Sequence, residues 1–240
     1  VMTVNEPCAQ LVRERGGVPA DRVHVILNAP DPGRFYPVDA RPELRRGRDH
    51  LVLWVGRMSR KEGLDLLLDA AEQLVHRHRR DDLAVAIVGR GDIRDELAAD
   101  IQRRGLGGVV DLPGEADDAQ LREWMATASV CVSLDERNAL NDRSIMIKVL
   151  EYMAMGRPVL QFPLAEMQRI CGDATLYARD GDASDLAAGL QMLLDDPIER
   201  DRLAALARAR ILDGLTWPEQ VPALLRAVSQ AVAMRRGGRQ

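Results

Sequence analysis

Seven short runs of apolar and β-branched residues alternate with helical patterns along most of this 240-residue chain. Nearly unbroken apolar strands are typical of a parallel sheet that helices cover on both faces. Between two of these runs, residues 64–77 carry one apolar stripe at helical spacing. Repeated strand, helix, strand units therefore predict an α/β fold with a doubly wound, Rossmann-like parallel sheet. The predicted strands are residues 23–27, 51–56, 83–89, 109–114, 130–134, 158–162 and 174–178.

The same rhythm predicts the domain organisation. Residues 29–50 interrupt it with four prolines, several arginines and no periodic apolar face, so we interpret them as an interdomain linker. Residues 1–28 hold one strand, one helix and one strand, which is too little to bury a core alone. Residues 51–212 form the main predicted domain, followed by a last amphipathic helix at 213–235. We expect the tail at 236–240 to be disordered.

Composition excludes several classes of function. A net charge of −4 and an aromatic content of 3% offer neither a basic footprint nor stacking platforms for nucleic acid. The longest apolar runs are about six residues, against the roughly 20 that a membrane helix needs. Three widely spaced cysteines, without a Cys-x-x-Cys pair, indicate reduced thiols in a cytoplasmic protein.

In an open parallel sheet, ligands bind beyond the carboxyl ends of the strands. The first turn of this kind is VGRMSRKEG, where Arg57 ends a strand and Lys61 precedes a helix that starts near Gly63. Free N–H groups at a helix start favour an anion, and two nearby cations suit a diphosphate. A solvated basic turn explains this stretch equally well.

The second turn is VGRGD, again between a strand and a helix. Gly89 and Gly91 would let the backbone approach a ligand closely, although such a pair more often forms only a tight turn. The turn lacks the third glycine and the distal acid of a dinucleotide fingerprint, which argues against NAD.

The third turn leads into a helix predicted over residues 144–155. There Ser144, Lys148 and Glu151 share one stripe, so amides near Ser144 could receive phosphate and Glu151 could accept two hydroxyl groups of a ribose. The alternative is a Lys148 to Glu151 surface pair worth roughly 0.2 to 0.5 kcal/mol. Spacing does not separate these interpretations. The residues expected to face the sheet are Ile145, Val149 and Met153.

Taken together, these stretches resemble the carboxyl-terminal half of the family-4 retaining glycosyltransferases of the GT-B fold, the glycosyl transferases group 1. That family runs from N-G-x-D through G-R with lysine-glycine, G-x-G, and an E-x7-E helix followed by A-M-A-x-G-x-P-V, to a late aromatic helix. The matching stretches are NAPD at 28–31, GRMSRKEG at 56–63, GRG at 89–91, EYMAMGRPV at 151–159 and TW at 216–217.

The resemblance implies a nucleoside-diphosphate sugar donor of the UDP, GDP or ADP type, and transfer with retention. It implies that Arg57 holds the diphosphate, that Glu151 holds the ribose hydroxyls, and that the turn from Leu112 borders the base. It implies neither a cofactor nor a metal. The implied catalytic residues are Arg57 and Lys61, and the implied donor-binding residues are Gly56, Gly89, Gly91, Pro113, Asp117 (or Asp118), Ser144, Ile145, Lys148 and Glu151.

One departure from the family pattern concerns the phosphate-binding lysine. Glu62 stands where the lysine normally precedes the glycine, and Lys61 lies one position early, about 100° around if the helix already includes it. The reach of Lys61 to a phosphate is therefore open.

Another departure concerns the donor sugar. Arg143 occupies the position of the first acid of E-x7-E, and Met146 replaces a glycine. The sugar contact of that acid is then absent, or comes from Glu136 or Asp142 in a lengthened loop.

Other potential ligands have simpler explanations. His76 and His78 lie in a charged helix end and are expected to be solvated rather than metal-bound. The DGD sequence at 180–182 is typical of a helix entry, with Asp182 or Ser184 as the cap.

In the family, residues 1–28 and 213–235 would belong to, or pack on, an amino-terminal acceptor domain. The chain would then lack most of that domain and transfer no sugar alone. Two alternatives stay open: a non-catalytic interaction module that kept the fold, and a sugar-nucleotide epimerase or phosphorylase.

Overall fold

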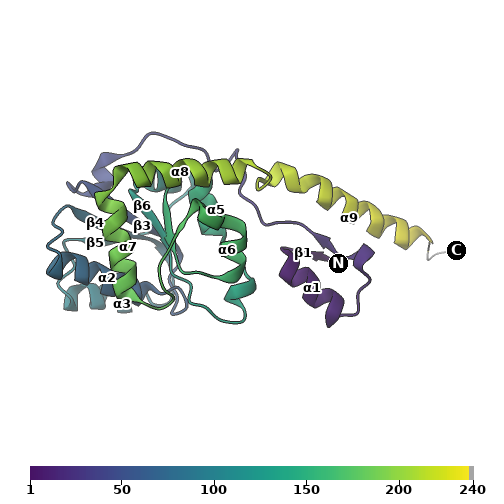
Figure 1. The fold of residues 1–240 in the computed structure, drawn as a ribbon, viewed down its shortest axis with the longest axis horizontal. Helices are drawn as coiled ribbons and strands as arrows, with labels where there is room; N and C mark the ends of the chain where they lie inside the picture. Colours follow the sequence, from purple (N-terminus) through teal and green to yellow (C-terminus); the bar gives the residue numbers. More distant parts are fainter. Residues whose placement is uncertain (238–240) are drawn as a thin grey trace.

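A six-stranded parallel sheet forms the centre of the computed structural model, which describes residues 1–237 (Figure 1). Its strands are β3 (His50–Arg57), β4 (Leu83–Arg90), β5 (Val110–Gly114), β6 (Val130–Ser133), β7 (Val159–Gln161) and β8 (Leu176–Tyr177). They are ordered β5-β4-β3-β6-β7-β8, and every pairing is parallel. The predicted doubly wound α/β fold is thus confirmed, and six of the seven predicted strands lie in this sheet.

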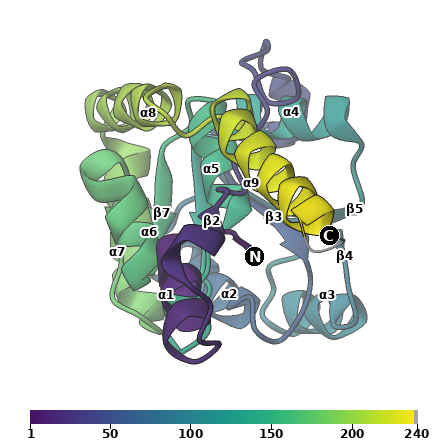
Figure 2. The ribbon, with the colours of Figure 1, turned by 90° about the vertical axis from the view of Figure 1, so that its right-hand side faces the viewer.

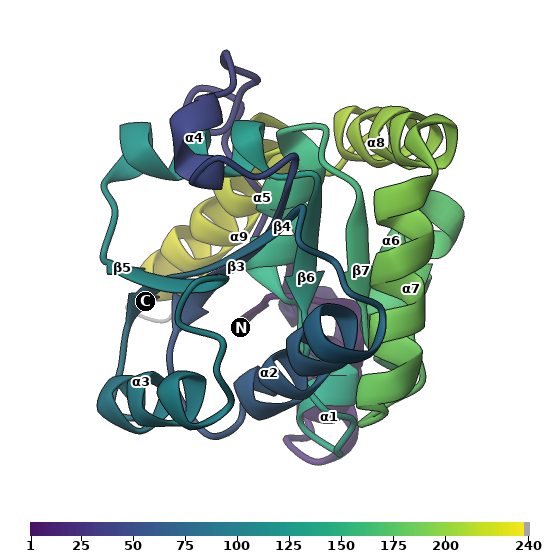
Figure 3. The same ribbon diagram turned by 90° about the vertical axis from the view of Figure 1, so that its left-hand side faces the viewer.

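Two helical layers cover the sheet because successive side chains of a strand point to opposite faces (Figure 3). The first layer consists of α2 (Leu64–Glu72), α3 (Arg94–Arg103) and α7 (Ala183–Asp195). The second consists of α4 (Asp118–Thr127), α5 (Ile147–Ala154), α6 (Ala165–Cys171) and α8 (Pro197–Leu212). On β3, Val52 and Trp54 pack in the core of the first layer, whereas Leu51 and Leu53 pack in that of the second.

Local sequence explains where these helices begin. Gly63 precedes α2 with a φ of 63°, and a Cβ there would lie 2.3 Å from the Leu134 carbonyl oxygen, so only glycine fits. The Asp182 carboxylate accepts hydrogen bonds from the first amides of α7, as predicted. The predicted helix at 64–77 is α2 followed by a π-helical turn, Gln73–Arg77.

A small second unit lies beside the main one (Figures 1 and 2). It contains β1 (Met2–Thr3), α1 (Glu6–Glu14) and β2 (His24–Val25), with the two strands parallel, and the long helix α9 (Trp217–Gly237) packs on it. The His24 ring nitrogen lies 2.6 Å from the Gln230 side-chain oxygen. Of the tail predicted to be disordered, residues 236 and 237 belong to α9, and residues 238–240 lie outside the described residues.

The segment predicted as a linker lies folded against α4. Phe35 is buried in the second layer's core, and the Arg41 amide donates to the Thr127 hydroxyl at 2.8 Å. The Arg41 guanidinium also pairs with Glu123 at 2.9 Å. The segment therefore forms one wall of the domain.

Cys8, Cys131 and Cys171 are free, as predicted, and the latter two are buried. Within residues 1–237, no helix combines the length and the apolar character needed to cross a bilayer. Across the same residues, no three His, Cys, Asp or Glu side chains come together as a potential metal site.

Candidate functional site

The strand order reverses between β3 and β6, where β4 and β5 lie on one side and β7 and β8 on the other. In doubly wound sheets, the crevice at the carboxyl ends of two such strands is the usual ligand site. The residues predicted for the site come from the carboxyl ends of β3, β4 and β5, from the turns that follow β3 to β6, and from helix α5. The structure therefore gathers these residues at one edge of the sheet.

The first turn leaves both of its predicted cations accessible. Arg57 is the last residue of β3, and its guanidinium lies 3.1 Å from the Asp92 carboxylate. The Arg57 side chain remains 72% exposed, and Lys61 is also exposed. Asp92, which the sequence analysis missed, is the counter-ion that an incoming anion would have to displace.

The glycines of the second turn are required by packing between neighbouring backbones. A Cβ on Gly89 would lie 1.9 Å from the Gly56 carbonyl oxygen, and one on Gly91 would lie 1.9 Å from that of Met58. Gly56 and Gly89 also line a hollow of about 310 Å³ at the carboxyl ends of β3 and β4. The residues around this hollow are Val55, Gly56, Arg57, Val88, Gly89, Arg90, Glu115, Ala116 and Leu121.

The turn between β5 and α4 closes one side of the hollow. Pro113 is exposed there. The Asp117 carboxylate caps α4 by accepting a hydrogen bond from the Gln120 amide at 2.9 Å, and the Gln120 side chain accepts one from the Asp117 amide at 3.0 Å. Asp118 binds the guanidinium of Arg34 through both oxygens, at 2.6 and 2.8 Å. Arg34 comes from the folded linker, and no sequence motif pointed to it.

The third turn differs from its prediction. Helix α5 begins at Ile147, so Ser144 does not share its stripe. The Ser144 hydroxyl donates to the Leu140 carbonyl at 2.8 Å and its amide to the Asn141 carbonyl at 2.9 Å, because residues 141–143 form a separate 3-10 turn. The predicted place of Ser144 on the helix stripe is therefore wrong, and its own amide is already hydrogen-bonded. Ile145, half-buried, precedes the helix as well.

Glu151 lies in the middle of α5, and no residue among 1–237 donates a hydrogen bond to its carboxylate or forms an ion pair with it. Burial raises the pKa of this carboxyl group to about 7, an effect that the Arg34 charge opposes and the Asp118 charge reinforces. Glu151 thus lies within range of the charges of Arg34 and Asp118, at the start of α4. An unpaired carboxylate in that position is suited to accept hydroxyl groups from a ligand.

Lys148 pairs with residues other than Glu151, so the surface-pair alternative is wrong. Its ammonium lies 2.5 Å from Glu62, 3.2 Å from Asp135 and 4.8 Å from the centre of the Trp54 ring. In the sequence, the glutamate at position 62, where the family pattern has lysine, pointed to this cluster. Nothing in the sequence pointed to Asp135.

Two loop acids were proposed to replace the missing first acid, and they have different surroundings. Asp142 accepts hydrogen bonds from the Ala165 amide at 3.0 Å and from the Arg137 guanidinium at 2.9 Å. Glu136 is exposed. The Arg143 guanidinium donates to the Ala139 carbonyl at 2.9 Å, so it stays within its own loop.

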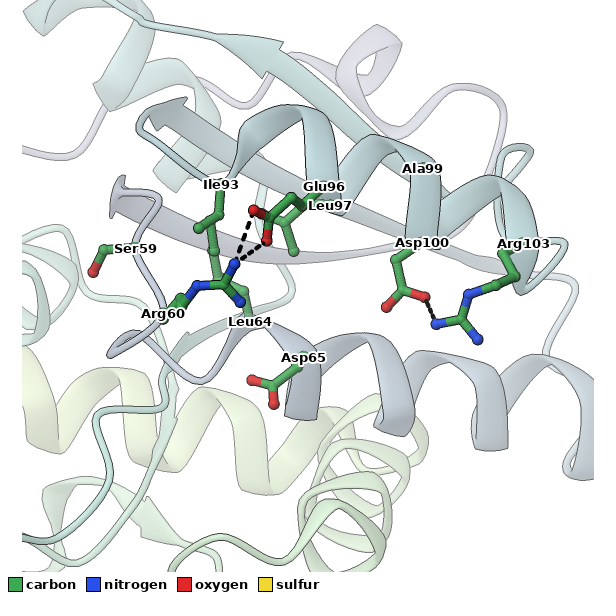
Figure 4. A pocket seen from close by; sticks show the side chains of 10 residues that line it. All are labelled: Ser59, Arg60, Leu64, Asp65, Ile93, Glu96, Leu97, Ala99, Asp100 and Arg103. Carbon is green, nitrogen blue, oxygen red and sulfur yellow. Dashed lines mark hydrogen bonds and ion pairs between the residues drawn. The ribbon is translucent and has the colours of Figure 1, made fainter.

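A second hollow, of about 430 Å³, lies between α2 and α3 (Figure 4). Across it, the Arg60 guanidinium binds both oxygens of Glu96, at 2.7 and 2.8 Å. None of the residues predicted for the site lines this hollow, whose walls are side chains of α2 and α3 together with Ser59, Arg60 and Ile93 from the turns before these helices. It is therefore separate from the candidate site.

A known protein family matches the part of the chain that carries the candidate site. The family model described as "Glycosyl transferases group 1" matches residues 49–196, which is more than half of the chain. The chain belongs to the glycosyl transferases group 1 family. The match spans the whole six-stranded sheet and includes every predicted site residue.

Two named glycosyltransferases are similar to most of the chain. A D-inositol 3-phosphate glycosyltransferase of Frankia alni is 32% identical over 231 residues, which cover 89% of this chain and 54% of the relative. The alpha-D-kanosaminyltransferase of Streptomyces kanamyceticus is 29% identical, with 85% of this chain and 53% of the relative covered. This chain thus spans about half the length of the curated relatives it matches.

Solved structures confirm the fold as the Rossmann-like half of a GT-B glycosyltransferase. Anabaena Alr3699/HepE in complex with UDP and glucose superposes with a TM-score of 0.79 at 19% identity, covering 95% of this chain and 62% of that one. The sucrose-phosphate synthase of Thermosynechococcus elongatus gives a TM-score of 0.77 at 24% identity, covering 97% and 58%.

Proposed function

We propose that this group 1 glycosyltransferase chain binds a nucleoside-diphosphate sugar and, within a longer enzyme, transfers the glycosyl unit to an acceptor with retention. The observation that carries the proposal is Glu151, an unpaired and largely buried carboxylate on α5 that senses the charges of Arg34 and of Asp118 at the start of α4. Burying an ion without a partner is costly, so such a group is expected where a ligand supplies the partner. Three free cysteines support a cytoplasmic location.

A nucleoside diphosphate fits the chemistry of this edge. Two vicinal ribose hydroxyls can donate to the two oxygens of Glu151, forming charge-assisted hydrogen bonds. The base would lie against the bare backbone of Gly56 and Gly89, bordered by the turn at Pro113. The diphosphate would then reach Arg57 and Lys61, whose charges stabilise the leaving group as the sugar departs. Because Anabaena HepE was solved with UDP, UDP is the first nucleotide to test.

An amino-terminal acceptor domain is the proposed partner of the small unit formed by β1, α1, β2 and α9. Apolar side chains of β1 and α9 stand exposed around a hollow of about 580 Å³. Contiguous exposed apolar surface of this kind favours a protein interface. The exposed apolar residues that line this hollow are Val1, Met2, Val228, Val232 and Met234. We accordingly expect the 240-residue chain alone to bind donor without transferring sugar.

A thermal-shift panel of UDP, GDP, ADP and TDP tests the proposal. At 100 times Kd, a ligand that binds only the folded state adds about 2.7 kcal/mol, or roughly 5 to 10 °C in Tm for a chain of this size. Glu151→Ala should lose this shift. Glu14→Ala, at an exposed acid on α1, should keep it.

The panel also separates the alternative functions. If no nucleoside diphosphate raises the Tm of the wild-type chain, the fold has been kept as a non-catalytic interaction module. An epimerase or phosphorylase would bind the nucleotide or phosphate but would show no glycosyl transfer when the complete enzyme is assayed with acceptor.

A further inference from the structure

The chain uses lysine almost nowhere. Of its 33 lysine and arginine residues, only Lys61 and Lys148 are lysines, and both lie near the point where the strand order reverses. Lysine carries a compact ammonium, whereas arginine carries a wide planar guanidinium. Lys148 occupies a space between two carboxylates and an indole ring that suits the smaller group. This singles out Lys148 as part of a site with defined geometry.

The Lys148 cluster joins both sides of the switch point. Trp54 lies on β3, Glu62 follows β3, Asp135 follows β6, and Lys148 is in the first turn of α5. The three charged side chains are largely buried, with exposed fractions of 14% for Lys148, 21% for Glu62 and 9% for Asp135. A buried set of charges is a poor source of stability, because its attraction must first offset the loss of hydration. These charges lie after β3 and β6, where the strand order reverses and where sheets of this kind bind ligands, so binding explains them better than stability does.

The charge of the cluster indicates what it binds. Two carboxylates and one ammonium carry a net charge of −1, so the cluster disfavours a phosphate and favours a neutral ligand with hydrogen-bond donors. Lys148 and the Ser133 hydroxyl use only Oε2 of Glu62 and Oδ2 of Asp135. Among residues 1–237, no donor reaches Oε1 of Glu62 or Oδ1 of Asp135. The fully buried Trp54 also has an indole N–H without a partner among these residues.

We propose that Glu62 and Asp135 form the subsite for the hydroxyl groups of the donor's glycosyl unit, with Lys148 as the residue that positions them. The proposal rests on the proposed function and deepens it. Sugar hydroxyls donate to the free oxygens of Glu62 and Asp135 without bringing charge into the crevice. The subsite also replaces the acid that is lost where Arg143 stands. Lys148 holds the two carboxylates at a fixed separation.

The test compares the affinity of this chain for UDP with its affinities for UDP-glucose, UDP-galactose and UDP-N-acetylglucosamine, by isothermal titration calorimetry. At least one sugar should improve binding about tenfold over UDP, as expected for one or two hydrogen bonds to a charged group. Glu62→Gln and Asp135→Asn should each remove most of that gain while keeping the affinity for UDP within about twofold. Lys148→Met should lower the same ratio.

Glu96→Gln is the matched control, because Glu96 pairs with exposed Arg60 outside the crevice and loses the same charge (Figure 4). It should leave the ratio unchanged. If the variants weaken UDP and UDP-sugar equally, the cluster has a structural or phosphate-facing role and the subsite is refuted. If the wild-type chain binds UDP but gains nothing from any sugar, the subsite is wrong while the proposed function stands. A wild-type chain that does not bind UDP overturns both.

Discussion

Two charged residues one helical turn apart on α5 have opposite surroundings. Lys148 contacts two carboxylates and an aromatic ring, whereas Glu151 has no partner among the described residues. Sequence spacing alone had allowed the two to pair with each other. The contrast shows that tertiary neighbours decide the state of each charge: α5 turns Lys148 toward β3 and β6, and Glu151 toward Arg34 and the start of α4.

The largest expected effect comes from removing the paired charge. Lys148→Met leaves two buried carboxylates close together without a counter-ion, so we expect the free energy of unfolding to fall by about 3 kcal/mol. Urea denaturation at pH 8 measures the change. The control is Lys61→Met, at the chain's other lysine, which is exposed and should alter stability by less than about 0.5 kcal/mol. Equal small changes in both variants would show that the Lys148 pairs contribute nothing.

Removing the unpaired charge of Glu151 should raise the stability of the ligand-free chain, whereas removing the charge of Lys148 should lower it. Burial raises the pKa of Glu151 from 4.5 to about 7, so the folded state holds its proton more tightly than the unfolded state. The energetic cost is absent below pH 4.5, grows as the pH rises, and is complete above pH 7. Glu151→Gln should therefore stabilise the ligand-free chain by about 2 kcal/mol at pH 8, with the gain vanishing near pH 4.5.

Urea titrations of the Glu151→Gln chain at several pH values between 4.5 and 8 test this dependence. Glu14→Gln, at an exposed acid on α1, should show no gain at any of these pH values. A stabilisation that did not change with pH would mean that Glu151 is not destabilised by its charge.

Ligand binding should reveal the same titration. If the ribose hydroxyls donate to ionised Glu151, the affinity for uridine falls below pH 7, by about tenfold per pH unit, because only the ionised fraction binds. Uridine is chosen because it carries no phosphate that would titrate in this range. Calorimetry from pH 5 to 8 measures the profile. Glu151→Gln should bind weakly with a flat profile, and a flat profile in the wild-type chain would exclude Glu151 from the ribose site.

The smallest expected effect comes from removing the carboxylate of Asp117, which caps a helix. Asp117 caps α4, so Asp117→Ala should cost about 1 kcal/mol of stability. If the cap is its main role, UDP affinity stays within about twofold of the wild-type value. A loss of UDP affinity well beyond that, in a chain that is only slightly destabilised, would return Asp117 to the donor-binding residues predicted from the sequence.

Much of the fold could be predicted from the sequence because short stretches of residues determine its strands and turns. Apolar, β-branched runs such as residues 83–89 are typical of central strands, and Gly63 adopts the left-handed backbone conformation that the turn before α2 requires. The start of α5 could not be predicted from the sequence. Residues 144–146 have helical spacing, but the hydroxyl and amide of Ser144 form hydrogen bonds with the preceding 3-10 turn. Two local hydrogen-bond patterns compete there, and residue spacing does not show which of them is more stable.

By itself, the sequence determined the alternation of strands and helices, the parallel sheet, and the order of motifs that places Arg57, Gly89 and Glu151 at its carboxyl edge. Only the tertiary structure decided which charges meet. Arg34 with Asp118, and Glu62 with Lys148, are each more than 80 residues apart in the chain. The strength of a charge interaction depends on the distance between the two charges and on their burial, and the spacing of residues along one helix predicts neither quantity.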